Sequence, residues 1–128
     1  MNGFPILICD DSMLARKSAR KALPRDWLVD VTYAANGREA VQALQNQHFG
    51  LVLLDLTMPE MDGVQILEAI REHKWETFVI VISGDIQPQM KDRVMSLGAL
   101  DFINKPVKAE RLGAILEMYG LFQASLVE

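Results

Sequence analysis

Polar side chains follow four short apolar runs of this sequence, at the points where those runs end. In chain order, these side chains belong to Asp10 and Asp11, Asp55, Ser83, and Lys105. Carboxylates that share one pocket repel one another, which makes each harder to ionise. A divalent cation relieves that repulsion, and Mg²⁺ typically uses one or two carboxylates with water and phosphate oxygens. If the fold brings these residues together, the set suits phosphoryl transfer to an aspartate.

Each of these residues has a simpler interpretation when it is taken alone. An Asp after a strand is usually a turn or helix-cap residue. Asp10 and Asp11 could be no more than the start of a helix, and Lys105 could lie in a solvated loop. The joint pattern favours a site, because residues of the right chemistry recur in order at four run ends.

The apolar runs have the length of strands. They are Pro5–Cys9, Val29–Ala34, Leu51–Leu54, Phe78–Ile82 and Asp101–Ile103. The first four are rich in residues that favour strands, whereas the fifth is the weakest by composition. The runs predict five short strands.

Helical patterns separate and follow these runs. Ser12 can cap a helix that reaches about Leu23, and Asn36 with Glu39 resembles a capping box. Pro88 suits the first turn of a later helix. Apolar stripes at helical spacing complete the pattern: Ala15, Ala19 and Ala22; Ala40, Val41 and Leu44; Val64, Leu67 and Ile70; Met90, Val94 and Leu97; and Leu112, Ile115, Leu116 and Tyr119.

Five strand–helix units predict a three-layer α/β sandwich. Strands joined by helical crossovers are parallel, and helices then cover both faces of the sheet. The carboxyl ends of parallel strands lie along one edge, where open α/β sheets bind ligands. We therefore expect the four polar run ends to meet in one pocket.

Composition and charge exclude several classes of protein. The chain has 128 residues, 50% of them hydrophobic, a net charge of −4 and an isoelectric point near 5.2, which argues against direct nucleic-acid binding. Its one cysteine, Cys9, has apolar neighbours and predicts a buried thiol. The sequence has neither an apolar run of membrane-spanning length nor a basic leader, so we expect no membrane association and a cytoplasmic location.

The motifs resemble those of bacterial response regulator receiver domains. ILICDDSMLAR is similar to the first strand and acidic pair of that family, and LVLLDLTMPEMDG to its phosphorylation segment. VIVISGD and GALDFINKPV are similar to its fourth and fifth strands. The resemblance implies a flavodoxin-like sheet of order 2-1-3-4-5 in a single receiver domain over 1–128, with a core of about 4–120.

The resemblance also implies a role for each matching residue. Asp55 is the phosphoacceptor, and Lys105 and Ser83 contact the phosphoryl oxygens. Phe102 is an aromatic switch that turns inward when Ser83 moves, and the Lys105–Pro106 bond is cis. The Mg²⁺ ligands, which can also hold Mn²⁺, are Asp10, Asp11, Asp55 and the backbone carbonyl of Thr57.

Some positions depart from the common family pattern or vary within it. Ser83 stands where threonine is common, and Phe102 stands where tyrosine is common, so a phenol hydrogen bond is lost. Thr57 and Asp85 flank the path of an attacking water and are expected to tune the lifetime of the acyl phosphate.

The resemblance implies a phosphorylation-dependent switch of a two-component system, and not an enzyme beyond its own phosphorylation and dephosphorylation. The expected partner is a sensor histidine kinase or phosphotransfer protein, and the expected output face is Met90–Tyr119, built from the fourth helix, fifth strand and fifth helix. The downstream effector, a domain after Glu128 and the oligomeric state stay open.

Other functions are weighed against the switch. An aspartate-nucleophile, Mg²⁺-dependent phosphatase of the haloacid dehalogenase type would use similar chemistry. Such enzymes usually carry a second acid two residues after the nucleophile, where this chain has Thr57. A pseudo-receiver that binds partners without phosphorylation is a further alternative, as is a flavin-binding module.

Overall fold

The computed structural model describes residues 3–58, 60–84 and 86–122, and within them strands and helices alternate strictly. The five strands are β1 (Phe4–Cys9), β2 (Val29–Ala34), β3 (Leu51–Leu54), β4 (Phe78–Ser83) and β5 (Asp101–Asn104). The five helices are α1 (Met13–Ala22), α2 (Gly37–Asn46), α3 (Gly63–His73), α4 (Pro88–Ser96) and α5 (Ala109–Met118). The predicted elements are confirmed, with strand ends that differ by at most one residue.

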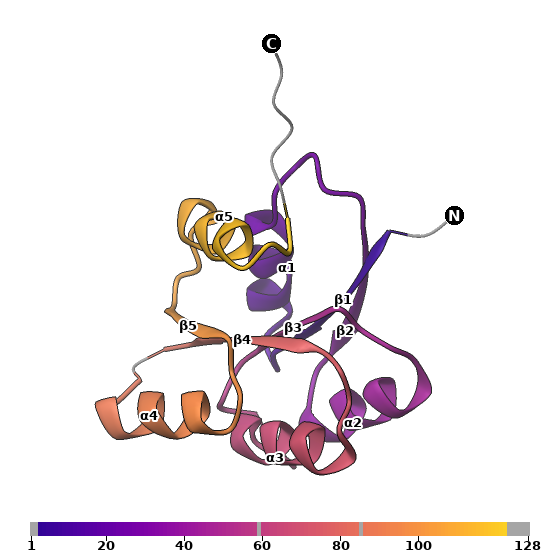
Figure 1. Cartoon of the computed structure of the whole chain (residues 1–128), viewed down its shortest axis with the longest axis vertical. Coiled ribbons are helices and arrows are strands. Elements are labelled where there is room, and N and C mark those ends of the chain that lie inside the picture. The colour runs from indigo at the N-terminus through magenta and orange to yellow at the C-terminus, as the bar shows by residue number, and fades with distance from the viewer. Residues whose placement is uncertain (1–2, 59, 85, 123–128) are drawn as a thin grey trace.

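All strand pairs are parallel, and the sheet has the order β2-β1-β3-β4-β5. Figure 1 shows α1 and α5 on one face of the sheet and α2, α3 and α4 on the other. The predicted three-layer sandwich and strand order are therefore confirmed. After β2 the chain returns to the far side of β1 and forms β3 there, so the direction of winding reverses between β1 and β3.

The sheet separates two hydrophobic layers, because successive residues of a strand point to opposite faces. In β3, Val52 and Leu54 pack into the layer under α2, α3 and α4, while Leu51 and Leu53 pack into the layer under α1 and α5. All four residues are at most 1% exposed. A strand buried on both faces needs a continuous apolar sequence, which LVLL provides.

Side-chain caps start three of the helices. Ser12 and Asn36 accept hydrogen bonds from Ala15 N–H and Glu39 N–H, as their positions in the sequence predict. The Glu39 carboxylate, however, accepts from Ala35 N–H, one residue before the cap. The reciprocal capping box is present at α3, between Asp62 and Gln65.

The end of α5 corrects one sequence prediction. Tyr119 was expected on the inward stripe of this helix, but it is 44% exposed. The helix ends at Met118, so Tyr119 caps the helix instead of continuing its buried face. Leu121 and Phe122 pack onto the α1–α5 layer in its place, with the Phe122 ring 5.4 Å from that of Trp27. Among the described residues, every helix is too short or too polar to cross a bilayer.

Leu112 tests how firmly α5 is packed, since it is fully buried under this helix. We expect Leu112→Ala to lower the free energy of unfolding by about 2–5 kcal/mol, through lost apolar burial and the cavity left behind. Leu28→Ala, at a loop residue that is 66% exposed, should change it by less than about 1 kcal/mol. Urea denaturation of both variants measures the difference, and equal effects would contradict this packing.

Candidate functional site

The polar residues at the strand ends meet at the carboxyl edge of the sheet, where the winding reverses. Asp10 follows β1 and Asp55 follows β3, and these strands are direct neighbours. The backbone ladder continues past the strands, because Asp55 N–H donates to the Cys9 carbonyl at 2.9 Å. Asp10, Asp55 and Ser83 are each at most 6% exposed. The predicted convergence in one place is confirmed.

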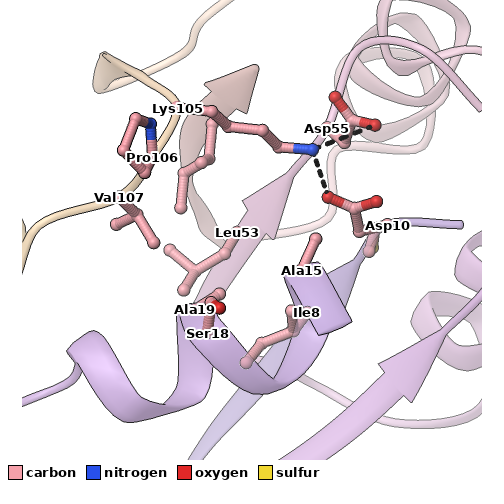
Figure 2. A pocket seen from close by; sticks show the side chains of 12 residues that line it. Ile8, Asp10, Ala15, Ser18, Ala19, Leu53, Asp55, Lys105, Pro106 and Val107 are labelled. Carbon is pink, nitrogen blue, oxygen red and sulfur yellow. Dashed lines mark hydrogen bonds and ion pairs between the residues drawn. The ribbon is translucent and has the colours of Figure 1, made fainter. Parts of the chain in front are cut away.

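Lys105 reaches this edge from the loop after β5. Its Nζ lies 2.6 Å from Asp10 Oδ2 and 3.8 Å from Asp55 Oδ2 (Figure 2). Its backbone N–H donates to the Ser83 carbonyl at 2.7 Å, which fixes the loop against β4. The bond from Lys105 to Pro106 is cis, as the sequence resemblance implies. Two buried carboxylates therefore share one ammonium, which offsets part of their charge.

Backbone groups around β1 hold Asp10 in place. Its Oδ1 accepts from Ser12 N–H at 3.0 Å, which turns the chain into α1. The Arg16 guanidinium donates to the Asp10 backbone carbonyl at 2.7 Å and lies 6.0 Å from the centre of the Tyr33 ring. Arg16 is not among the site residues that the sequence predicts. Its position one turn into α1, beside the acidic pair, is the signal that could have found it.

Burial raises the pKa of Asp55 above its ordinary value, and the charge of Asp10 raises it further. The ammonium of Lys105, the Thr57 backbone N–H and the Ser83 hydroxyl act in the opposite direction but do not cancel the rise. Ionisation of Asp55 is thus less favourable in the folded protein than in water. A group that brings positive charge to this edge stabilises the carboxylate form.

The acidic residues fit a hard metal ion. Carboxylate oxygens of Asp10, Asp11 and Asp55 all lie within 4.8 Å of one another. Asp11 is exposed, so an ion there could keep bound water, as Mg²⁺ usually does. Thr57, whose carbonyl is the fourth expected ligand, is exposed two residues beyond Asp55. Asp85, expected to tune the same site, lies outside the described residues.

The start of α3 packs closely against the chain that follows Asp55. Gly63 N–H donates to the Leu56 carbonyl at 3.0 Å. A Cβ on Gly63 would lie 2.8 Å from both the Asp55 carbonyl oxygen and the Leu56 Cα, which is closer than side chains tolerate. Gly63 therefore allows the first turn of α3 to support the loop that carries Asp55 and Thr57.

Phe102 lies on β5, partly buried against the layer under α4. Lys91 of α4 places its Nζ 4.4 Å from the centre of the Phe102 ring, within the range of a cation–π interaction. Sequence reasoning found the aromatic residue but not this lysine. The Phe102 ring thus lies beside Lys91 of α4 in this structure.

Comparison with known proteins shows the family. The model of the response regulator receiver domain matches residues 6–117. This chain belongs to the response regulator receiver domain family. Receiver domains are the signalling modules of two-component systems; they bind Mg²⁺ at an acidic pocket and interact with histidine kinases or phosphotransfer proteins.

Individual relatives agree with the family. The chain is 36% identical over 107 residues to the chemotaxis protein CheY of Bacillus subtilis, which covers 84% of this chain and 89% of that protein. It is 31% identical over 121 residues to a probable C4-dicarboxylate response regulator, DctR, of Priestia megaterium, covering 94% of this chain and 53% of that protein. The chain thus spans about half the length of the latter relative.

Solved structures show the same fold. A CheX–CheY–BeF₃–Mg²⁺ complex from Borrelia burgdorferi matches with a TM-score of 0.83 and 31% identity, over 94% of this chain and 90% of that one. The receiver domain of a response regulator, NarL, from Mycobacterium tuberculosis matches with a TM-score of 0.82 and 27% identity, over 94% of this chain and 98% of that one.

One further relative, from Geobacter sulfurreducens, is a protein-glutamate methylesterase, of which this chain covers 29%. Receiver domains therefore also occur as parts of enzymes.

The raised pKa of Asp55 predicts a pH-dependent effect on stability. A carboxyl whose pKa is raised by folding destabilises the fold above that pKa, and the effect disappears as the pH falls toward the ordinary value of 3.8. In the absence of divalent cations, Asp55→Asn should therefore raise the urea midpoint near neutral pH. The gain should shrink as the solution is acidified. Asp30→Asn, at an exposed residue of β2, is the control. A stability loss at neutral pH would contradict the electrostatic argument.

Proposed function

We propose that this chain is a switch in which Asp55 accepts a phosphoryl group from a histidine kinase or phosphotransfer protein. One observation carries the proposal: two buried carboxylates, Asp10 and Asp55, end adjacent strands and share the Lys105 ammonium. Asp55 is the acceptor because it lies between Asp10 on one side and Ser83 on the other, with Lys105 within 3.8 Å. A phosphoryl group on Asp55 would thus meet both a hydroxyl and an ammonium.

Asp10, Asp11 and Asp55 would hold Mg²⁺, with the Thr57 carbonyl as a further ligand. When bound, the ion supplies positive charge that offsets the charge on the phosphoryl oxygens. Lys105 would supply a second positive charge, and the Ser83 hydroxyl would donate a hydrogen bond to a phosphoryl oxygen. Thr57 and Asp85 are proposed to set how readily water reaches the acyl phosphate. The Borrelia CheY complex with BeF₃ and Mg²⁺ supports this arrangement, because that chain is 31% identical to this one.

Phosphorylation itself is the first test. With Mg²⁺ and a small acyl-phosphate donor, the chain should gain the mass of one phosphoryl group, as intact-protein mass spectrometry would show. Asp55→Asn should lose this gain, because an amide is a poor nucleophile. Asp26→Asn, at an exposed residue outside the site, should keep it. Equal uptake by Asp55→Asn would exclude Asp55 as the acceptor.

A phosphate-release assay with small phosphoesters separates the switch from a phosphatase. A switch takes up one phosphoryl group and loses it again, whereas a haloacid dehalogenase-type enzyme releases phosphate continuously from small phosphoesters. We propose the switch because Thr57 stands where such enzymes place their second acid. Sustained turnover of several phosphoesters would favour the enzyme instead.

We propose that the output surface is formed by α4, β5 and α5, with Phe102 as the moving part. In the present structure, Lys91 covers the Phe102 ring at 4.4 Å. If Phe102 turns inward as Ser83 binds the phosphoryl group, this contact is lost. Lys91 therefore favours the present position of the ring and opposes activation.

Removing that contact should make activation easier. We expect Lys91→Gln to bind beryllofluoride with Mg²⁺ about two- to fivefold more tightly, since a cation–π contact of this kind contributes about 0.5–1 kcal/mol. Lys91→Arg keeps a cation over the ring and should resemble the parent chain. Fluorine NMR of the bound beryllofluoride measures both affinities. Unchanged or weaker binding by Lys91→Gln would show that Lys91 does not restrain the switch.

The partner proposal is supported by the charge of α1. Five of the chain's 13 lysines and arginines lie between Met13 and Arg25, a segment without Asp or Glu in a chain with 17 acids. Met13 and Leu14, at the start of α1 beside the site, are 58% and 78% exposed. A basic face with exposed apolar residues fits a partner that presents an acidic, partly apolar surface.

A charge reversal on α1 tests this docking. We expect the double variant Lys17→Glu, Lys21→Glu to slow phosphotransfer from a histidine phosphodonor protein more than about tenfold at low salt, and less at high salt. Phosphorylation by a small donor should be unchanged, which separates docking from chemistry. Lys74→Glu, beyond α3, is the control. If the double variant keeps the full rate of phosphotransfer, the partner does not dock on α1.

A further inference from the structure

A cavity of about 380 Å³ opens beneath the Lys105 side chain, on the α1–α5 side of the sheet. Figure 2 shows its three walls: α1 with Ala15 and Ala19, the strands with Ile8 and Leu53, and the loop with Pro106 and Val107. The phosphoryl chemistry proposed above uses the polar end of this cavity. Its apolar body has no part in that chemistry.

The cavity exists because one face of α1 carries small side chains. Ala15, Ser18 and Ala19 follow one another at helical spacing and all line the space. The opposite wall is apolar: Ile8 and Leu53 are each 1% exposed. An apolar cavity of roughly 150 Å³ already holds a benzene ring, and ligand pockets begin at about 300 Å³. The space is therefore large enough for an aromatic ring with a short side chain.

The polar end of the cavity is acidic. Asp10 and Asp55 line it together with Lys105, so two carboxylates face one ammonium. The third carboxylate, of Asp11, lies beside them within 4.8 Å. An uncharged apolar molecule would leave this excess of negative charge unbalanced. An ammonium group at the same end would balance it and donate hydrogen bonds to the carboxylate oxygens.

We propose that this cavity binds a small amphipathic amine, with its apolar body between α1 and β3 and its ammonium group at Asp10 and Asp55. The body packs against Ala15, Ala19 and Leu53. The amine occupies carboxylate oxygens that the proposed acceptor reaction also uses, so the bound molecule inhibits phosphorylation. Binding itself does not depend on that reaction, because the walls and charges are present in the unphosphorylated chain.

The test uses the whole chain and 2-phenylethylamine as the probe, in a buffer without divalent cations that would compete for the carboxylates. Titration followed by amide NMR should show saturable shifts in α1 and β3, with a dissociation constant on the order of 1 mM for a ligand of this size. 2-Phenylethanol, which lacks the charge, should bind at least about fivefold more weakly, and 3-phenylpropanoate should not bind.

Filling the cavity tests its location. Ala19→Leu adds three carbon atoms to the α1 wall and should weaken amine binding more than about tenfold. Ala114→Leu makes the same change on the exposed side of α5 and should leave binding unchanged. If Ala19→Leu does not fold, Ala15→Leu fills the same cavity from the same helix and is used in its place. The proposal is overturned by the lack of saturable shifts, by equal affinity for the alcohol or the acid, or by full-strength binding to the filled variant.

Discussion

The repulsion between the Asp10 and Asp55 carboxylates is the interaction on which this end of the molecule depends. Strand pairing fixes the two residues side by side, because Asp55 N–H bonds the Cys9 carbonyl and neither backbone can move away. Burial adds to the cost of the Asp55 charge. Lys105 offsets part of it, with Nζ 2.6 Å from Asp10 and 3.8 Å from Asp55. A pocket that still holds excess negative charge attracts cations, and a metal-dependent phosphoryl acceptor makes use of that property.

Much of this arrangement could be predicted from the sequence, because it follows from short-range rules. The run LVLL has no polar residue and so had to be a strand covered on both faces, and the structure places it at the centre of the sheet. Parallel strands bring their carboxyl ends to one edge, so the convergence of Asp10, Asp55 and Lys105 follows once the alternation of strands and helices is known. Ser12 and Asn36 mark helix starts by a local hydrogen bond that needs no tertiary context.

The features that could not be predicted depend on distances between elements. The sequence does not say that Lys105 lies closer to Asp10 than to Asp55, since this is set by the path of the loop after β5. Lys91 meets Phe102 only through the packing of α4 on β5. Tyr119 matched the apolar period of α5 but is exposed, because the helix ends one residue before it. The roles of Ser83, Phe102, Thr57 and Asp85 in the switch stay predictions.

The most direct measurement is a titration of the chain with Mg²⁺, followed by amide NMR and compared with Asp11→Asn and Asp62→Asn. We expect one saturable site whose largest shifts fall around Asp10, Asp11 and Asp55. We also expect Asp11→Asn to weaken binding by about tenfold or more, because the ion loses a charged ligand at the exposed side of the site. Asp62→Asn removes a charge from the start of α3 while keeping a capping side chain, and should bind as the parent chain does. Unsaturable shifts, or equal weakening by both substitutions, would contradict the claim that these three carboxylates form a metal-dependent acceptor site.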